Sequence, residues 1–462
     1  MTTQQSASTN DTAPTGDILI RGAHLLTQDP EFGELVGDVL IRNGKIAAIG
    51  PDLGSADTGG VTVIDGTDRA VLPGFVDTHR HTWQGAVRQT GIGWDFGAYR
   101  QHIQLTWGPE YTPDDVYVGN IIGALGALDA GITTLRDESH IQNSPDHSDQ
   151  AVAALQDSGI RGVFAYGWPS IDSNKWMLRG EATHPNDIRR VRQQLLPDDT
   201  ARVTLQAMLR GPELSTTEVT AQDLALAREL GVRSSMHVGN GPWGPEFRGI
   251  GSLGEAGLLG EDLLFIHCCT SDDEELRMLA DSGAHASVSA AIEAVLPGLG
   301  APATGRLLAH GIRPSLSIDT EATVAGDMFN VMRSALTAHG LGITMQPEAY
   351  ADLPAFTPRD LLEFATIAGA KASGLADRTG SLTVGKDADL IVFRLDQFTT
   401  VPSSDIAASI VGAGHPGNVE TVLVAGKAAK WNGHLTHPDL ADLRTRGEAS
   451  RDRLLATPLV EG

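Results

Sequence analysis

The sequence predicts an α/β fold, a (β/α)8 TIM barrel with a small β-sandwich domain built from both chain ends. Three observations lead to this fold class. Both ends of the chain consist of short strand-like runs, each end with an Asn-Gly turn, at Asn43-Gly44 and Asn432-Gly433. Between the ends, after Pro73-Gly74, short apolar runs alternate with stretches of helical periodicity. Repeated βα units imply a parallel sheet, and about eight of them would close a barrel.

The first elements in chain order are a tail and the first part of the sandwich. Residues 1–16 are polar and small, without a basic stretch followed by an apolar one, so we expect a disordered tail and no signal peptide. Residues 17–73 are expected to form the first part of the sandwich. An Asn-Gly pair between two apolar runs is a strong hairpin signal. The expected strands are Asp17–Ile20, Asp38–Ile41, Lys45–Ile49, Val61–Ile64 and Ala70–Leu72.

Residues 74–379 are expected to form the barrel. Thr112-Pro113 is typical of a helix start, because a hydroxyl cap precedes a proline in the first turn. Ser271 and Glu274 have the spacing of a capping box for a later helix. Seven short apolar runs predict barrel strands: Phe75–Asp77, Ile132–Leu135, Val203–Met208, Ser234–Val238, Leu263–Cys268, Ala284–Ser289 and Ser315–Ile318.

The chain then returns to β structure. Residues 380–436 are expected to complete the sandwich, with strand-like runs in Gly380–Phe393 and Val419–Gly433. Residues 437–462 are expected to form a C-terminal helix and tail. The helix is predicted at about Asp439–Leu455, because that stretch is rich in charged residues, as a surface helix is.

Composition excludes some partners. With 58 acidic and 34 basic residues, the chain carries a net charge of −24, which would repel nucleic acid and anionic membranes. No apolar run reaches the roughly 18 residues that a membrane span requires. The two cysteines, Cys268 and Cys269, are neighbours in an expected strand and cannot form a disulfide framework. We therefore expect a cytoplasmic protein that binds a small molecule, with neither nucleic acid nor membrane as a partner.

Histidines and one aspartate fall at the ends of expected barrel strands. His79 and His81 follow the first barrel strand and, two residues apart, face the same side. His237, His267 and Asp319 each stand at the end of another expected strand. Imidazole and carboxylate are ligands for zinc, and also for iron(II), manganese or copper. Such an ion would lower the pKa of a water molecule toward about 7. Asp319 could touch the metal and accept the proton of that water.

Six segments together resemble the amidohydrolase superfamily, specifically its chlorohydrolase and cytosine-deaminase-like branch, which holds one metal. They extend through nearly the whole chain after the tail. They are PGFVDTHRHTWQ (Pro73–Gln84), GITTLRDESH (Gly131–His140), MHVGN (Met236–Asn240), IHCCTSDDEE (Ile266–Glu275), SLSIDTE (Ser315–Glu321) and GSLTVGKDADLIVF (Gly380–Phe393).

The resemblance implies that His79, His81, His237 and Asp319 hold the metal. It also implies that His267 is no permanent ligand and orients the attacking water or the polarised group of the substrate, so that His267 and Asp319 are the catalytic residues. Residues 201–214, where binuclear relatives keep a carboxylated lysine, contain no lysine, so one divalent ion is expected. Zinc is expected, with iron(II) or copper as alternatives, and no organic cofactor is expected.

Two positions depart from the family pattern. Asn240 stands where deaminating relatives usually carry a glutamate that transfers a proton, and an amide cannot do so at neutral pH. Thr270 stands where relatives often have another histidine. The resemblance therefore predicts either that another group protonates the leaving atom or that the reaction does not need this acid. Glu293 and Glu321 are candidate replacement acids.

Several further residues are expected at the barrel mouth. Arg210 directly follows a strand and could grip a carboxylate, as could Arg80 and Arg88. The predicted substrate contacts are Arg210, His140, Gln84, Trp83 and Asn240. For each of them a structural role is the alternative. Trp83 in particular could stack on a planar substrate or simply pack at the barrel mouth, and Asp137 is expected to fix backbone or His140.

Three functions follow from this pattern. The first is a hydrolase in which activated water attacks an sp2 carbon bearing nitrogen, in a small aromatic or heterocyclic substrate. The second is a metal-assisted cyclodehydratase of secondary metabolism that forms a benzoxazole-type ring from an aminobenzoate-derived substrate. The third is a non-catalytic scaffold, which the retained set of metal ligands argues against. A homodimer is common among relatives, and the sequence leaves the oligomeric state open.

Overall fold

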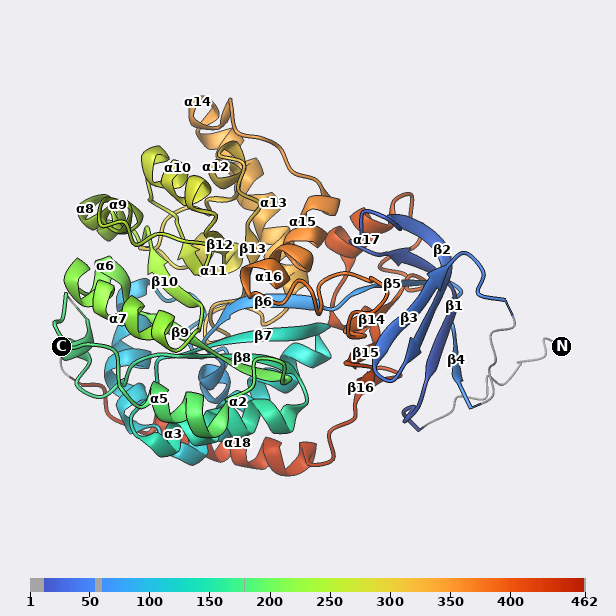
Figure 1. The fold of residues 1–462 in the computed structure, drawn as a ribbon, viewed down its shortest axis with the longest axis horizontal. Coiled ribbons are helices and arrows are strands. Elements are labelled where there is room, and N and C mark those ends of the chain that lie inside the picture. The colour runs from blue at the N-terminus through green and yellow to red at the C-terminus, as the bar shows by residue number, and fades with distance from the viewer. Residues whose placement is uncertain (1–11, 55–59, 178, 461–462) are drawn as a thin grey trace.

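The computed structural model describes residues 12–54, 60–177 and 179–460. Most of the expected tail, residues 1–11, lies outside the described residues, as do the last two residues of the chain. Two sheets, one parallel and one mixed, organise the molecule (Figure 1). Among the described residues, no helix has the length and apolar character that crossing a bilayer would require.

The eight-stranded sheet is parallel and confirms the predicted barrel. Its strands pair in chain order, and the last of them returns to the first. At that seam the amide of His81 donates to the carbonyl oxygen of Asp319 at 2.7 Å, and the amide of Asp319 donates to that of His79 at 2.9 Å. The strands are β6 (Phe75–Arg80), β7 (Ile132–Ser139), β8 (Arg161–Tyr166), β9 (Val203–Leu209), β10 (Ser234–Val238), β11 (Leu263–His267), β12 (His285–Val288) and β13 (Ser315–Leu316).

Strand β8 is the one barrel strand that the sequence pattern missed. All six of its residues are buried, yet it begins with the charged Arg161. The guanidinium Nε donates to Asp389 Oδ2 at 2.6 Å, and Nη2 donates to Asp387 Oδ2 at 2.8 Å. Both carboxylates belong to the segment that returns to the second sheet. The buried ion pair therefore joins the barrel to that sheet through residues more than 200 positions apart.

Helices alternate with the barrel strands and surround them (Figure 1). Helix α2 begins at the predicted Thr112-Pro113 cap, where Thr112 and Asp115 form a capping box. The capping box before α10 lies one residue later than predicted, because Asp272 and Glu275 make it. The main helices are α2 (Pro113–Asp129), α3 (Pro145–Ser158), α7 (Thr217–Glu229), α9 (Gly249–Glu255), α10 (Asp273–Ser282), α12 (Thr304–Ala309), α13 (Met328–Met345), α15 (Pro358–Phe364), α16 (Ile367–Ala372), α17 (Ile406–Ala413) and α18 (Leu440–Leu455).

The second sheet takes strands from both chain ends, as predicted. Nine strands are hydrogen-bonded in one mixed sheet, in which β5 pairs with β14 across more than 300 residues. Asn43 and Asn432 both adopt positive φ, with Gly44 and Gly433 after them, as type I′ hairpin turns require. The strands are β1 (Ile18–Leu26), β2 (Glu34–Arg42), β3 (Lys45–Gly50), β4 (Thr62–Asp65), β5 (Arg69–Pro73), β14 (Leu390–Arg394), β15 (Val419–Val424), β16 (Lys427–Trp431) and β17 (His434–Leu435). We propose that the two sheets mark two domains, with boundaries near residues 73 and 379.

Candidate metal centre

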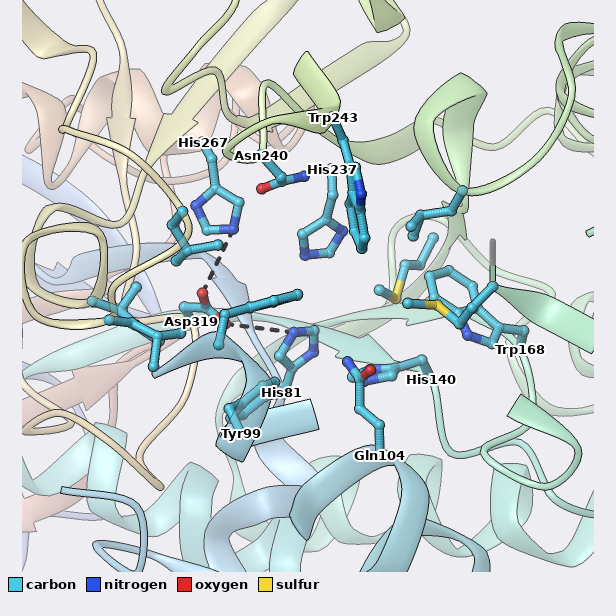
Figure 2. A pocket seen from close by; sticks show the side chains of 17 residues that line it. His81, Tyr99, Gln104, His140, Trp168, His237, Asn240, Trp243, His267 and Asp319 are labelled. Atoms are coloured by element: carbon cyan, nitrogen blue, oxygen red, sulfur yellow. Dashed lines mark ion pairs between the residues drawn. The ribbon is translucent and has the colours of Figure 1, made fainter. Parts of the chain in front are cut away.

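Four imidazoles and one carboxylate meet at the carboxyl ends of the barrel strands, and Figure 2 shows three of these histidines, His81, His237 and His267, together with Asp319. The ligand atoms of His79, His81 and His237 all lie within 4.8 Å of one another, and so do those of His79, His267 and Asp319. Asp319 Oδ1 lies 3.3 Å from His79 Nε2 and 3.5 Å from His81 Nε2. Residues that are up to 240 positions apart in the sequence thus converge, because parallel strands end on the same face of a barrel.

The chemistry of this donor set fits a divalent metal. His79 is fully buried, and neither of its ring nitrogens has a hydrogen-bond partner among the described residues. Burial, followed by the neighbouring charges of His81 and His267, holds the pKa of His79 well below 6.5, and burial does the same for His237. Neutral imidazoles with buried lone pairs aimed at one another are costly without a cation between them.

The next layer of contacts orients two of the histidines. His81 Nδ1 lies 2.8 Å from the carbonyl oxygen of Glu138, so the proton sits on Nδ1 and the lone pair of Nε2 faces the centre. His267 Nδ1 lies 2.9 Å from Glu293 Oε1, and that oxygen also accepts from the amide of Ser289 at 2.8 Å. Burial opposes the charged form of His267, but Glu293 and Asp319 outweigh it and raise the pKa of His267.

Two residues of the centre adopt a backbone conformation that side chains rarely take. His267 has φ of 74° and Asp319 has φ of 70°. A residue other than glycine in this region costs on the order of 1–3 kcal/mol, and such residues concentrate at functional sites. Both side chains lie beside His79 at the strand ends, where His267 Nε2 lies 3.6 Å from Asp319 Oδ2.

A cavity opens onto the centre, and its walls are mostly apolar (Figure 2). None of the lining residues is a lysine or an arginine. The polar groups are the histidines, Asp319 and three uncharged side chains, Tyr99, Gln104 and Asn240. The apolar walls consist of Phe96, Trp168, Met177, Met208, Leu214, Trp243, Ile292, Leu296 and Leu299.

Two of the five predicted substrate contacts line the cavity. His140 does so between His81 and Trp168, and burial keeps its pKa well below 6.5. Asn240 does so and is 8% exposed. The Nδ2 of Asn240 donates to Glu213 Oε2 at 3.4 Å, which leaves Oδ1 buried and without a partner among the described residues.

The other three predicted contacts do not line the cavity. The guanidinium of Arg210 donates to the carbonyl oxygens of Trp176, Gly180 and Ala182 and forms an ion pair with Asp223 at 3.8 Å. Trp83 and Gln84 lie in the 3-10 helix η1 (Thr82–Val87), which turns both of them into the protein. Trp83 is fully buried against Tyr111 and His140, so the packing alternative describes it.

The remaining candidates are also engaged elsewhere. Glu321 forms ion pairs with Arg80 at 3.1 Å and with Arg88 at 2.8 Å, so neither these arginines nor Glu321 is free for a substrate. Asp137 accepts a hydrogen bond from the amide of Thr82 at 3.2 Å, which agrees with its expected role in fixing backbone. Thr270 donates to the carbonyl oxygen of Gly241 at 2.8 Å.

Sequence reasoning missed most of the cavity wall. Tyr99 and Gln104 come from α1 (Phe96–Tyr99) and the π-helix η2 (Arg100–Trp107), a segment for which no element was predicted. Trp168 follows β8 in a loop, and Trp243 is the first residue of the short helix α8 (Trp243–Phe247), which follows β10. Position alone could have suggested them, because the loops after barrel strands form the active face of this fold.

The sequence is similar to known proteins over most of its length. A family model described as "Amidohydrolase family" matches residues 70–429. The 5'-deoxyadenosine deaminase of Methanosarcina mazei is 29% identical over 433 residues, covering 89% of this chain and 92% of the relative. The 5-methylthioadenosine/S-adenosylhomocysteine deaminase of Symbiobacterium thermophilum is 27% identical over 406 residues, covering 85% of this chain and 88% of the relative.

Two solved structures share the fold. A zinc-bound adenosine deaminase from Xanthomonas campestris superposes with a TM-score of 0.80 at 22% identity, covering 96% of this chain and 99% of that one. The atrazine chlorohydrolase of Arthrobacter aurescens TC1, complexed with zinc, superposes with a TM-score of 0.81 at 23% identity, covering 94% of this chain and 100% of that one.

Proposed function

Because the chain belongs to the amidohydrolase family, we propose that it is a metal-dependent hydrolase of a small, uncharged aromatic heterocycle. Water attacks an sp2 carbon that bears nitrogen, and the C–N bond breaks. The observation that carries this proposal is the convergence of three histidines and Asp319 at the floor of an apolar cavity. The relatives described above as deaminases support it, because they act on aminated heterocycles.

In this proposal His79, His81, His237 and Asp319 hold one divalent ion. The zinc-bound proteins of the same fold support zinc. A bound divalent ion supplies Lewis-acid chemistry, which makes water a stronger nucleophile at neutral pH and polarises the carbon under attack.

The chain's own residues handle the protons. Asp319 accepts the proton of the attacking water, since its carboxylate is the one base among the cavity-lining side chains other than the histidines. His267 donates a hydrogen bond from Nε2 toward the developing negative charge, while Glu293 holds Nδ1 on the other side of the ring. The apolar walls exclude bulk water and strengthen both interactions.

The cavity's polarity defines the substrate class. A carboxylate or phosphate on the substrate would find no lysine or arginine among the described residues that line the cavity, because Arg210 is held by backbone carbonyls and Asp223. Two buried amide oxygens, Asn240 Oδ1 and Gln104 Oε1, lack donors among the described residues. Each is an acceptor for an N–H group of the substrate. Trp168 and Trp243 offer apolar faces for a planar ring.

A panel of compounds tests the proposal. Zinc-loaded protein is incubated in isotopically labelled water with aminated heterocycles, aromatic amides and ortho-substituted aminobenzoates, and the products are followed by mass spectrometry. Loss of ammonia with uptake of labelled oxygen, or addition of water across an amide, is the expected result. Loss of one water from a single substrate molecule would instead identify a cyclodehydratase. None of the relatives named above is described as an enzyme of that kind. No change across the panel would contradict the proposal and favour the scaffold.

Replacing Asn240 tests whether a missing acid limits the release of ammonia. Asn240→Glu places a carboxyl group beside Glu213, whose own pKa burial raises to about 7. Two adjacent carboxyl groups share a proton, so the introduced side chain can protonate a leaving amine. We expect the rate of ammonia release from an aminated heterocycle to rise roughly 100-fold.

Asn240→Gln is the matched control, because it has the same length as glutamate but no acidic proton. Steady-state assays of released ammonia compare the two variants with the parent. An equal change in both variants, or no gain in Asn240→Glu at unchanged metal content, would show that proton supply at this position does not limit the reaction.

A further inference from the structure

A chain of hydrogen bonds extends from the loop after Asp319 to Tyr99 in the cavity wall. The amide of Ala322 donates to Thr320 Oγ1 at 3.1 Å, and the hydroxyl of Thr320 donates to Gln84 Oε1. The Nε2 of Gln84 donates to the hydroxyl oxygen of Tyr99 at 2.7 Å. Thr320 and Gln84 are fully buried, and Tyr99 is 5% exposed.

These bonds have a single direction. Thr320 Oγ1 accepts from the backbone N–H of Ala322 and donates its own hydrogen to Gln84 Oε1. This contact fixes the Gln84 amide, with Oε1 toward Thr320 and Nε2 toward Tyr99. The hydroxyl oxygen of Tyr99 is therefore an acceptor in this contact, and its hydrogen must be directed to another group.

The hydrogen of the Tyr99 hydroxyl has no acceptor among the described residues, whereas Tyr99 lines the cavity next to the metal centre (Figure 2). Burial, and then the charge of Asp319, raises the pKa of Tyr99, so the hydroxyl keeps its hydrogen. Gln84, a predicted substrate contact, does not line the cavity itself. It is connected to the cavity through its hydrogen bond to Tyr99.

We propose that Tyr99 is a catalytic residue that donates a hydrogen bond to the substrate, and that Gln84 and Thr320 are positioning residues that aim it. The acceptor is a ring nitrogen or the oxygen anion that forms during attack. Together with Asn240 Oδ1 and Gln104 Oε1, which are acceptors, the Tyr99 hydroxyl presents both kinds of hydrogen-bonding group to an aminated heterocycle. Only the kind of substrate in this proposal rests on the proposed function.

A double-mutant cycle separates this role from a structural one. Tyr99→Phe removes only the hydroxyl, and Gln84→Met removes the amide while keeping its shape. Because Gln84 acts through the Tyr99 hydroxyl, the double variant should lose no more than Tyr99→Phe alone. We expect kcat/KM for the substrate found in the panel to fall roughly 10- to 100-fold in Tyr99→Phe and less in Gln84→Met.

Binding of triaminotriazine to the zinc-loaded protein provides a readout that needs no turnover. This neutral probe is threefold symmetric, so every orientation presents a ring nitrogen and amino groups to the walls. Calorimetry should show roughly tenfold weaker binding to Tyr99→Phe and the same non-additive pattern. If the parent turns the probe over, the cycle is measured in kcat/KM instead.

The results distinguish a failure of the proposed hydrolase function from a failure of the proposed role of Tyr99. If no panel compound is converted but the binding cycle is non-additive, the proposed function fails and the role of Tyr99 stands. Parent-like binding or activity in Tyr99→Phe overturns the inference. A double variant whose loss equals the product of the two single losses also overturns it, since Gln84 would then act independently of Tyr99. Failure of the parent to bind the probe overturns it as well. Equal zinc content and melting temperature in all four proteins exclude a folding defect.

Discussion

His79→Ala is expected to reduce the metal content from about one ion per chain to below about one-tenth after dialysis against a chelator. His79 is the fully buried centre of the cluster and belongs to both groups of residues that could hold an ion. Activity should fall by at least about a thousandfold, because the activated water is lost with the ion. Elemental analysis and activity of the same sample measure both effects.

The control for this variant is His310→Ala. His310 lies outside the cluster, 3.5 Å from Asp273, and its loss should change neither metal content nor activity. Full activity of His79→Ala in a sample free of metal would refute the catalytic role of the ion. A parent-like metal content in His79→Ala would instead show that the ion is held elsewhere in the chain.

Asp319→Asn is expected to lower kcat by roughly 1,000-fold or more, even when the variant is saturated with zinc. Asparagine keeps the shape of the side chain but cannot accept the proton of the attacking water. Its neutral amide also takes a negative charge away from His79, His81 and His267, which lie 3.3, 3.5 and 3.6 Å from the carboxylate oxygens. The measurement is kcat at saturating zinc, with metal content determined in parallel.

Asp137→Asn is the matched control for that variant. Asp137 is a buried carboxyl group on strand β7, does not line the cavity and has its pKa raised to about 7 by burial. Its replacement should change kcat by less than about threefold, since surrounding structure is kept. Retention of more than about one-tenth of the parent's kcat by Asp319→Asn at equal zinc content would exclude Asp319 as the base.

The alternation of strands and helices was sufficient to predict the barrel and the contribution of both chain ends to the second sheet. Strand β8 was missed because its first residue, Arg161, is charged. Only the long-range pairing with Asp387 and Asp389 makes its burial favourable. A sequence pattern read locally has no access to that pairing.

The five residues of the centre could be predicted because their position follows from topology. Each stands at the carboxyl end of a strand, and a parallel barrel collects those ends on one face. The substrate contacts could not be predicted in the same way. Gln84 and Trp83 are close to His81 in sequence, but the helical turn η1 directs them into the protein.

The cavity wall depends on loops whose paths no periodicity records. Tyr99 reaches the cavity from a short helix capped by Asp95, and Trp168 and Trp243 come from connections after two different strands. Arg210 directly follows strand β9, as the sequence predicted. Its guanidinium nevertheless turns to three backbone carbonyls, because these groups also need donors when they are buried.

Anomalous X-ray diffraction from crystals of the zinc-loaded protein, recorded at the zinc absorption edge, locates the ion directly. A single strong peak bounded by the side chains of His79, His81, His237 and Asp319, with the cavity on its open side, is the predicted result. A peak at another place in the chain, or crystals of fully active protein that show no peak for any bound metal, would contradict the account.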